Sequence, residues 1–265
     1  MGKSTVVYRT LEVPPVRSSL RILTLNCCLL PSGVYQSGGD DDREDRARRI
    51  ARLVQRYDIV LLQEVFTTFW CTRWKKELTQ VPGMHIVVAD KRARLLDSGL
   101  MILSKYPVLH SSFTRFQNTS LTNHVLERGY LYAELQTPNG SLHVVNTHLN
   151  PSECHLGKLS AHEYRENQMR EILEFKAQKH KDSEAWVLGG DFNDQEIPQT
   201  LLKGYHVSLQ STLPATSHRE VSFALTSETP HECIDYLVSN REQIESTLLR
   251  SLVSDHYGVE VRLVL

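Results

Sequence analysis

Several apolar segments of this sequence end in, or contain, an ionisable or amide side chain. "ILTLN" ends in an amide, "IVLLQE" in a carboxylate, "VVNTH" in a histidine, and "WVLGGDFN" in an acid and an amide. "ECIDYLV" holds a carboxylate among apolar residues, and "VSDH" places an acid and a histidine just before the last apolar run. A turn or a helix cap explains any one of them. Together they predict that several strands deliver polar ends to one site. The side chains concerned are Asn26, Glu64, His148, Asp191, Asn193, Asp235, Asp255 and His256.

The acidic members of this set indicate a hard cation. Glu64 and Asp255 suit Mg²⁺, which keeps several waters and takes only one or two protein carboxylates. No group of histidines and cysteines has the sequence spacing of a zinc site, so the pattern disfavours zinc. We therefore expect Mg²⁺, with Mn²⁺ as the alternative.

The other members suit acid–base chemistry and phosphate binding. His256 with a carboxylate partner would form a unit that titrates near neutral pH. Asp235, inside an apolar strand, needs a partner that offsets its desolvation. Asn26, Asn193 and His148 can donate hydrogen bonds to a phosphoryl oxygen. No Ser or Cys lies in a nucleophile motif, so we expect water to attack a phosphomonoester or phosphodiester directly.

The segments that must position these residues are buried strands with few helices between them. After a probable arm over residues 1–18, helices are expected from Arg43 to about residue 57 and over 161–178. Pro-Asn-Gly at 138–140 predicts a hairpin turn. Neither strict strand–helix alternation nor a Gly-rich phosphate fingerprint is present. We predict an α/β (α+β) layered fold, with a single catalytic domain over residues 19–265. Strands are expected over residues 20–30, 58–65, 98–108, 129–137, 141–149, 185–192, 233–239 and 254–265.

Composition and cysteine usage restrict the setting of this chemistry. Thirty Lys and Arg against 31 Asp and Glu give a net charge of −1, so bulk charge does not argue for a nucleic-acid-binding protein. The irregularly spaced Cys27, Cys28, Cys71, Cys154 and Cys233 indicate buried thiols in a reducing compartment. No signal peptide is recognisable, and no run approaches the roughly 18 apolar residues of a membrane span. We expect a soluble, cytoplasmic protein.

The ordered motifs "LN", "QEV", "NTHL", "GDFN", "IDY" and "SDH" resemble those of the endonuclease/exonuclease/phosphatase superfamily. This superfamily includes deoxyribonuclease I, abasic-site endonucleases, inositol polyphosphate 5-phosphatases and neutral sphingomyelinases. The resemblance runs from about residue 20 to residue 265. It implies a four-layer α/β/β/α sandwich, deoxyribonuclease I-like, with two mixed β-sheets face to face and the site at the sheet edges.

The resemblance also implies roles on the metal side of the site. Glu64 corresponds to the magnesium ligand, with Asn26 supporting metal and phosphate and Asp255 beside the metal. His148 would contact the phosphate.

On the water side, Asp191 would orient or deprotonate the attacking water, and Asn193 would stabilise the pentacoordinate phosphorus. His256 would be the other catalytic histidine, oriented by Asp235. The assignment of the general base between Asp191 and His256 stays open. The glycine pair at 189–190 is interpreted as a tight turn beneath the phosphate.

Among the branches, the neutral sphingomyelinases resemble this chain best. "LTLNCCLLPSG", the Arg-rich segment before "IVLLQEVF", and "DSGLMILSKYPV" are similar to their opening blocks. Arg128 falls where that branch often carries Lys before Gly, which implies a substrate-binding role. The branch implies a monomeric, magnesium-dependent phosphodiesterase that cleaves a phospholipid head group with peripheral membrane contact. The aromatic segment at 65–78 offers either a lipid-facing surface or, as we favour, the core face of a helix.

Two other functions stay open. A nuclease or nucleotide phosphodiesterase of the same fold is the main alternative, supported by the basic stretches "RWKK" at 73–76 and "KRAR" at 91–94. Isolated basic clusters are more often a solvated surface. The third alternative is a binding module without catalysis, which the retained functional residues argue against.

Overall fold

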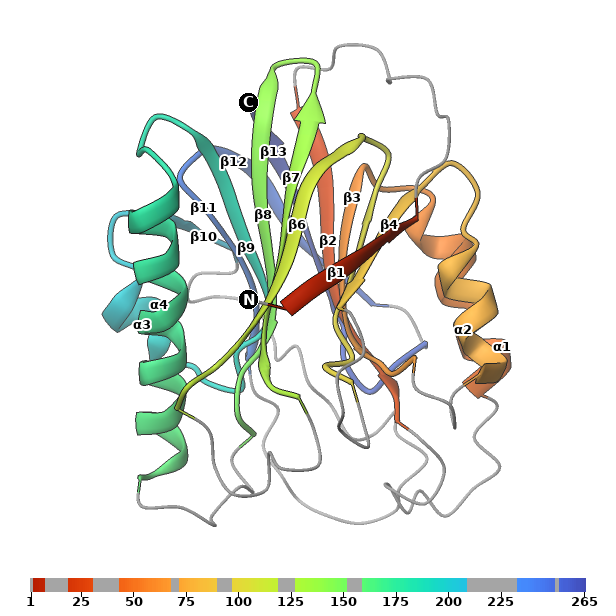
Figure 1. The fold of residues 1–265 in the computed structure, drawn as a ribbon, viewed down its shortest axis with the longest axis horizontal. Helices are drawn as coiled ribbons and strands as arrows, with labels where there is room; N and C mark the ends of the chain where they lie inside the picture. The colour runs from red at the N-terminus through yellow and green to blue at the C-terminus, as the bar shows by residue number, and fades with distance from the viewer. Residues whose placement is uncertain are drawn as a thin grey trace.

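Strands that are buried along nearly their whole length build two mixed β-sheets that pack face to face, with helices on the outside (Figure 1). The structure is a computed structural model that describes residues 2–7, 19–30, 43–67, 72–89, 97–118, 127–151, 159–208, 233–250 and 253–265. The helices are α1 (Arg43–Val54), α2 (Thr72–Thr79), α3 (Ala161–Lys179) and α4 (Ile197–Leu201). The strands are β1 (Gly2–Val7), β2 (Ser19–Leu29), β3 (Ile59–Val65), β4 (His85–Ala89), β5 (Met101–Ser104), β6 (Val108–Arg115), β7 (Gly129–Thr137), β8 (Gly140–His148), β9 (Ala185–Asp191), β10 (His206–Val207), β11 (Asp235–Ser239), β12 (Gln243–Leu249) and β13 (Gly258–Val264).

The strand order separates the chain into two sheets joined at one edge. One sheet runs β10-β11-β9-β8-β7-β6, and the other runs β4-β5-β3-β2-β13-β12. Strand β1 pairs antiparallel with both β6 and β4 and so links them. The β2–β3 and β8–β9 pairs are parallel, so within each pair both strands end at the same edge. That edge is where the predicted site residues lie.

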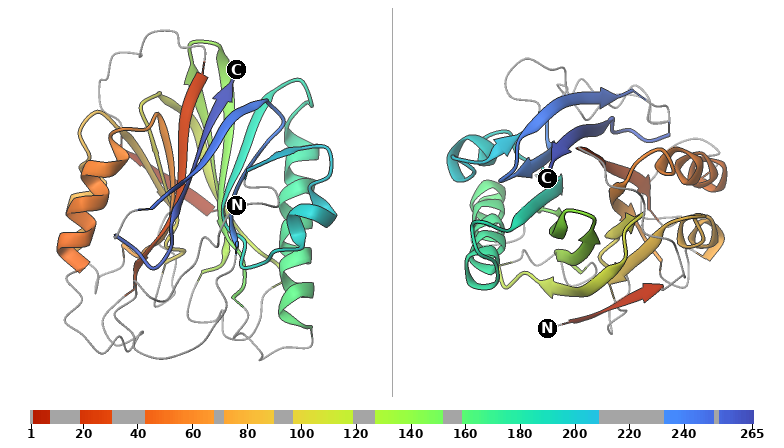
Figure 2. Two further views of the ribbon diagram at one scale, coloured as in Figure 1. Left: turned by 180° about the vertical axis from the view of Figure 1, so that it is seen from behind. Right: turned by 90° about the horizontal axis from the view of Figure 1, so that it is seen from above.

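Successive residues of a strand face different layers, which produces the predicted four-layer arrangement. Leu61 packs in the core between the sheets, whereas its neighbour Leu62 packs in the core beneath α1. Likewise Val144 faces the other sheet and Val145 faces α3. Figure 2 shows α1 and α2 over one sheet and α3 and α4 over the other. The predicted fold class is confirmed.

A buried amide pair connects the two sheets. Gln63 of β3 donates from Nε2 to Asn146 Oδ1 of β8 at 2.7 Å, and also to Thr24 Oγ1 at 3.0 Å. Asn146 donates from Nδ2 to the carbonyl oxygens of Leu62 and Met101 at 2.8 and 2.9 Å. Both amide side chains are 0% exposed. Because an unpaired amide in such a position would be costly, this bridge fixes the sheets in one relative register.

Two strand predictions differ from the structure. The segment 98–108 is not a single strand, because β5 ends at Ser104 and β6 begins at Val108. Ser104 Oγ accepts a hydrogen bond from the Tyr106 backbone N–H at 2.9 Å, and Pro107 has no N–H to donate. Within the expected N-terminal arm, Gly2–Val7 forms β1. The division into an arm and a single domain stays a prediction.

Other expectations concern helices and thiols. The helix expected at 161–178 is α3, and it begins with a capping box between Ser160 and Glu163. None of the helices in the described part of the chain is long and apolar enough to cross a membrane. Among the described cysteines, Cys27 is buried and free, and Cys28 and Cys233 are half-buried and free. Cys71 and Cys154 lie outside the described residues.

Replacing Gln63 by Ala should lower the free energy of unfolding by about 3 kcal/mol, since Asn146 loses its buried donor and the site loses volume. The matched control is Gln136→Ala, whose exposed side chain is also in a strand; it should change stability by less than about 0.5 kcal/mol. Urea unfolding followed by circular dichroism gives both values. Equal stability of the two variants would show that the bridge contributes nothing.

Candidate active site

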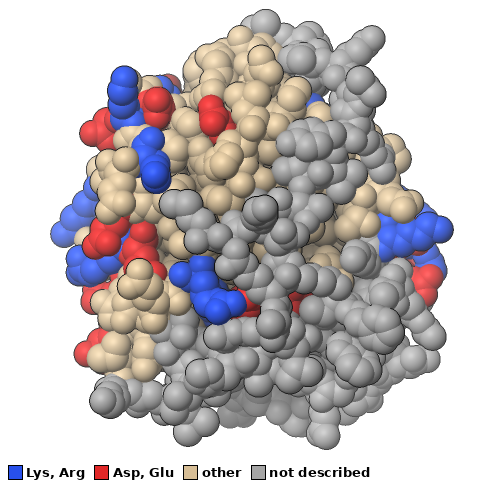
Figure 3. Space-filling view, in the orientation of Figure 1, with Lys and Arg blue, Asp and Glu red and all other residues tan. Residues whose placement is uncertain are grey.

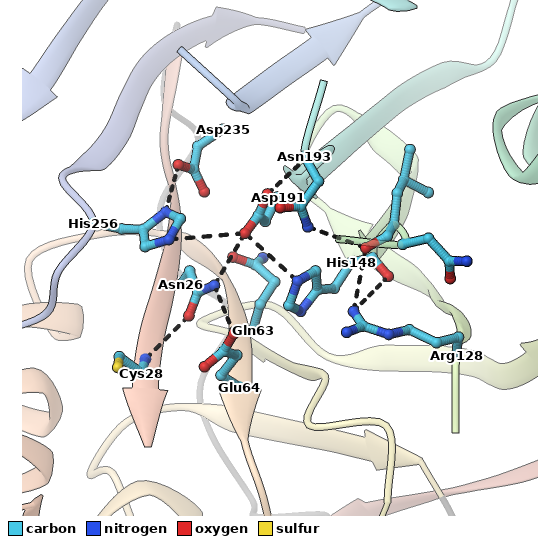
Figure 4. A network of polar contacts seen from close by, with 12 residues as sticks. Asn26, Cys28, Gln63, Glu64, Arg128, His148, Asp191, Asn193, Asp235 and His256 are labelled. Carbon is cyan, nitrogen blue, oxygen red and sulfur yellow. Dashed lines mark hydrogen bonds and ion pairs between the residues drawn. The ribbon is translucent and has the colours of Figure 1, made fainter. Parts of the chain in front are cut away.

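Strand register alone brings acids and a histidine of three strands together. In the β8–β9 pair His148 lies opposite Asp191, and in the β9–β11 pair Asp235 also lies opposite Asp191. Asp191 is therefore the central residue of a row that crosses the edge of the sheet (Figure 4). His148 Nε2 lies 3.6 Å from Asp191 Oδ2. All three side chains are buried, with exposures of 7, 2 and 0% for His148, Asp191 and Asp235.

The second sheet contributes an amide and a carboxylate to the same point. Asn26 of β2 donates from Nδ2 to Asp191 Oδ2 at 3.0 Å and to Glu64 Oε1 at 3.2 Å. Its carbonyl oxygen Oδ1 accepts from the backbone N–H of Cys28 at 3.0 Å, which fixes the orientation of the amide. The amide of Asn26 thus links Glu64 of one sheet to Asp191 of the other.

The backbone at this edge departs from ordinary strand geometry. Among the described non-glycine residues, Cys28, Glu64 and Asn193 have positive φ, at 48°, 55° and 50°. The β2–β3 register shifts between Asn26 and Leu29. Left-handed backbone is costly for residues with a Cβ, and it is frequent where a side chain must be aimed at a functional site.

His256 and Asp235 form a buried dyad. His256 Nδ1 donates to Asp235 Oδ2 at 2.7 Å, and its backbone N–H donates to Ser254 Oγ at 3.2 Å. Burial disfavours the charged imidazole, but the charge and hydrogen bond of Asp235 outweigh burial and hold the pKa of His256 well above its ordinary value. The other ring nitrogen, Nε2, lies 3.9 Å from Asp191 Oδ2. The partner that a buried Asp235 requires is therefore His256.

Burial and neighbouring charges shift the pKa values of Asp191 and His148 and keep the His148 imidazole neutral. Burial, and next the charge of Asp235, raise the pKa of Asp191. Burial, with the positive charges of Arg128 and His256, holds the pKa of His148 well below its ordinary value. His148 is therefore neutral near pH 7 and presents one N–H as a hydrogen-bond donor.

Asn193 and Arg128 are fixed by the backbone of the loop after β8. Asn193 donates from its backbone N–H to Asp191 Oδ1 at 2.9 Å and from Nδ2 to the carbonyl of Leu149 at 3.1 Å. Arg128 donates from Nη1 to the carbonyl oxygens of His148 and Leu149 at 3.3 and 3.2 Å. Arg128 thus positions the backbone of His148 and brings a positive charge to the edge of the site (Figure 4).

The oxygen donors of the site fit a hard divalent cation. Burial raises the pKa of Glu64, and the charge of Asp255 raises it further, so the two carboxylates repel each other. Asp255 is half-buried and accepts from Ser254 Oγ at 3.2 Å. Acidic oxygens under mutual repulsion are the donors that Mg²⁺ prefers. Asp191, Asp235 and His256 also offer atoms within 4.8 Å of one another, although His256 Nδ1 already binds Asp235.

The glycine pair at 189–190 has a different purpose from the predicted turn. Both glycines lie within β9 and pair with both neighbouring strands. A Cβ on Gly189 would lie 2.6 Å from Leu61 of the other sheet, and one on Gly190 would lie 1.9 Å from the carbonyl oxygen of Thr147. The expectation of a turn beneath the phosphate is therefore wrong: the glycines allow close packing of strands and sheets behind the site.

Several residues that support the site were not predicted from the sequence. Gln63, Asn146 and Ser254 make the buried hydrogen bonds that hold its framework. The polar letters inside "VLLQEV" and "VVNTH" were a signal for the first two, because a buried amide needs a partner. Asp194 accepts from the backbone N–H groups of Glu196 and Ile197, which start α4, and so acts as a cap.

Comparison with known proteins agrees with this geometry. The sequence profile of the Endonuclease/Exonuclease/phosphatase family matches residues 23–256. The chain belongs to this family. It is 23% identical to the sphingomyelinase C of Bacillus cereus over 266 aligned residues, which cover 89% of this chain and 79% of that protein. The chain is accordingly a phosphoric diester hydrolase.

Solved structures show the same fold. The beta toxin of Staphylococcus aureus with bound magnesium ions superposes with a TM-score of 0.70 and 18% identity, covering 92% of this chain and 99% of that one. TDP2 of D. rerio, complexed with a single-strand DNA product, superposes with a TM-score of 0.72 and 16% identity, covering 94% and 100%. A magnesium-bound toxin and a DNA-bound protein therefore share this architecture.

Replacing Asp235 by Asn should lower kcat on a chromogenic phosphodiester by ~10³-fold or more, with KM nearly unchanged, because an amide cannot hold His256 in the same tautomer and charge state. The matched control is Asp182→Asn, whose carboxylate is 98% exposed and bonds Lys176; it should keep full activity. Initial rates at saturating and limiting substrate separate kcat from KM. A near-normal kcat in Asp235→Asn would exclude the dyad from the reaction.

Proposed function

We propose that this protein is a Mg²⁺-dependent phosphodiesterase that removes the head group of a choline phospholipid such as sphingomyelin, in the manner of a phospholipase C. The observation that carries the proposal is the similarity to a sphingomyelinase C over 89% of this chain. The geometry supports it, because the amide of Asn26 and the imidazoles of His148 and His256 lie 3.0, 3.6 and 3.9 Å from Asp191 Oδ2. A phospholipid substrate implies peripheral contact with a membrane, and we propose that the enzyme acts as a monomer.

Within this proposal, Glu64, Asn26 and Asp255 hold the metal. Mg²⁺ would supply positive charge that stabilises the phosphoryl oxygens in the transition state. Mn²⁺ is a suitable substitute because it accepts the same oxygen ligands. The supporting observation is the repulsion between the Glu64 and Asp255 carboxylates, which a cation would relieve.

The protein's own residues would move the proton and bind the phosphate. Asp191 lies between two imidazoles, at 3.6 Å from His148 and 3.9 Å from His256, so a water bound there would meet a carboxylate and two N–H groups. We propose that the Asp191 carboxylate takes the proton of this water as it attacks the phosphorus, while the N–H of His256 holds the water in place.

Groups next to Asp191 would bind the substrate phosphate. We propose that Asn193 and the neutral His148 donate to the phosphoryl oxygens. Arg128 would add a positive charge for the substrate phosphate from behind His148.

A nuclease activity is the second candidate, favoured by the superposition on TDP2 in complex with a DNA product. A nucleic-acid surface would be a continuous basic stripe. On the face shown in Figure 3, however, Lys and Arg are interspersed with Asp and Glu over the described residues. The stretches "RWKK" and "KRAR" contribute no described side chains except Lys76.

The aromatic segment does not add a described lipid surface. Phe66 is 2% exposed and packs in the core beneath α1, so it is buried as expected, although it follows β3 and is not on a helix. Phe69 and Trp70 lie outside the described residues, as does the side chain of Trp74. Tyr205 is half-buried and packs against Trp186, with ring centroids 5.7 Å apart.

The substrate class is tested by release of phosphocholine from sphingomyelin in detergent micelles, beside nicking of supercoiled DNA in the same buffers. We expect phosphocholine release that requires Mg²⁺, stops on addition of a chelator and returns with excess Mg²⁺, without nicking. Nicking without lipid cleavage would transfer the protein to the nuclease branch. Lipid cleavage in the presence of chelator would contradict the metal assignment.

Asp191→Ala and His256→Ala should each reduce phosphodiesterase turnover by ~10³-fold or more while Tm changes little, because these groups serve the transition state. His206→Ala is the matched control for His256, since His206 is exposed and distant in the fold; full activity is expected. Rates and melting curves are measured on the same preparations. If either site variant turns over at nearly the wild-type rate, the assignment is wrong.

A further inference from the structure

A second cluster of ligand-type side chains lies at the opposite end of β8 from the active site. His143 of β8, His180 at the end of α3 and Glu184 just before β9 offer ligand atoms that all lie within 4.8 Å of one another. His143 Nε2 and His180 Nδ1 each lie 3.6 Å from the same Glu184 oxygen, Oε2. The two imidazole rings have centroids 4.0 Å apart.

These spacings do not correspond to hydrogen bonds. A separation of 3.6 Å is too long for an N–H···O bond. It is close to the spacing of ligands that share one ion: ligand atoms bound at about 2.0–2.1 Å in a tetrahedral arrangement are roughly 3.3 Å apart. Small movements of the three side chains towards an ion would therefore let all three bind it.

In each of the two histidines, the ring nitrogen that faces Glu184 is free to bind a metal ion: Nε2 of His143 and Nδ1 of His180. Tyr132 pairs its hydroxyl with His143 Nδ1 at 2.9 Å, which orients the ring and turns Nε2 towards Glu184. This is the outer support that metal-binding histidines usually have. The ring of His180 is only 6% exposed, and its Nε2 is buried without a hydrogen-bond partner. The nitrogen of His180 that faces Glu184 is the other one, Nδ1, so Nδ1 is the atom placed to bind an ion.

The surroundings favour a cation at this position. Glu134, opposite His143 across the β7–β8 pair, adds a second negative charge. The nearby Lys176 is compensated by Asp182 at 2.8 Å. Glu184 is 40% exposed, which leaves an open path from solvent.

We propose that His143, His180 and Glu184 form a binding site for a divalent transition-metal ion of the Zn²⁺ type, separate from the magnesium-binding active site. Two imidazoles and one carboxylate are the donors of borderline ions such as Zn²⁺, whereas Mg²⁺ prefers oxygen ligands alone. The ion would tie the end of α3 and the start of β9 to the β7–β8 hairpin. The site is thereby structural, and the binding test does not depend on the proposed phospholipid substrate.

The two sites are well separated along β8. His143 precedes the active-site His148 by about 17 Å of extended strand. His143 also shares the strand face of Val145, which packs beneath α3, whereas the active site lies at the end of the strand. Occupation of one site therefore leaves the residues of the other free.

Titration of Zn²⁺ into the full-length protein by calorimetry, in the presence of millimolar Mg²⁺, tests the site. We expect one Zn²⁺ bound per chain and a rise in Tm. Glu184→Gln and His180→Gln should each weaken this binding ~10-fold or more. Gln at position 184 retains an oxygen that can accept from the Lys181 backbone N–H, which Glu184 accepts at 3.0 Å, so the variant should fold.

The control is His206→Gln, which removes an exposed histidine elsewhere and should leave Zn²⁺ affinity unchanged. Absence of Zn²⁺ binding would overturn the proposal. So would binding that both cluster variants keep at wild-type affinity, or binding that Glu64→Gln abolishes, since the ion would then occupy the active site.

Discussion

The buried hydrogen bond between Gln63 and Asn146 is the constraint on which the active site depends. It connects the middle of one sheet to the middle of the other at 2.7 Å, a few residues before both strands end. Hydrophobic packing between sheets tolerates small shifts, whereas a fully buried amide pair does not. With the sheets fixed in this way, Asn26 of one sheet can donate to Asp191 of the other at 3.0 Å. The relative positions of Asn26, His148, Asp191 and Asp235 are therefore a consequence of strand pairing and sheet packing, whereas Asn193 and His256 lie outside the strands.

The same rigidity explains how the site can hold so much buried charge. Asp191 and Glu64 accept hydrogen bonds from the same Asn26 amide, and Asp235 is hydrogen-bonded to His256. Burial alone would favour the neutral form of all three carboxyl groups. The His256 imidazolium, the Asn26 amide and the Asn193 backbone N–H offset part of that cost. Burial, and next the negative charge of Asp255, raise the pKa of Glu64, and a bound cation would relieve that repulsion. A site of this kind sacrifices stability in the metal-free protein for preorganisation towards a charged phosphate.

Most of the fold and the core of the site could be predicted because strand ends carry a local signal. An apolar run that stops at Asn26, Glu64, His148 or Asp191 is visible in the sequence, and the structure brings these residues together. Features that depend on which strand lies alongside leave no such signal in the local sequence. The separate strands β5 and β6, the insertion of β1 between the sheets, and the packing purpose of Gly189 depend on distant residues. The cluster of His143, His180 and Glu184 was invisible for the same reason, since its members come from three elements without a metal-site spacing.

The proposed reaction acts on a phosphodiester and does not distinguish the two groups that the phosphodiester joins. One architecture superposes on both a magnesium-bound toxin and a DNA-bound protein at nearly equal TM-scores, 0.70 and 0.72, so the fold alone does not set the substrate. Substrate choice must then come from the segments that enter and leave the strands at this edge, such as those after β2 and β8 and before β11. A rigid polar centre on strand ends, surrounded by connections free to vary, allows the substrate to change while the chemistry stays the same. The sequence similarity to a sphingomyelinase C over 89% of this chain is the observation that favours a phospholipid over DNA as the proposed substrate.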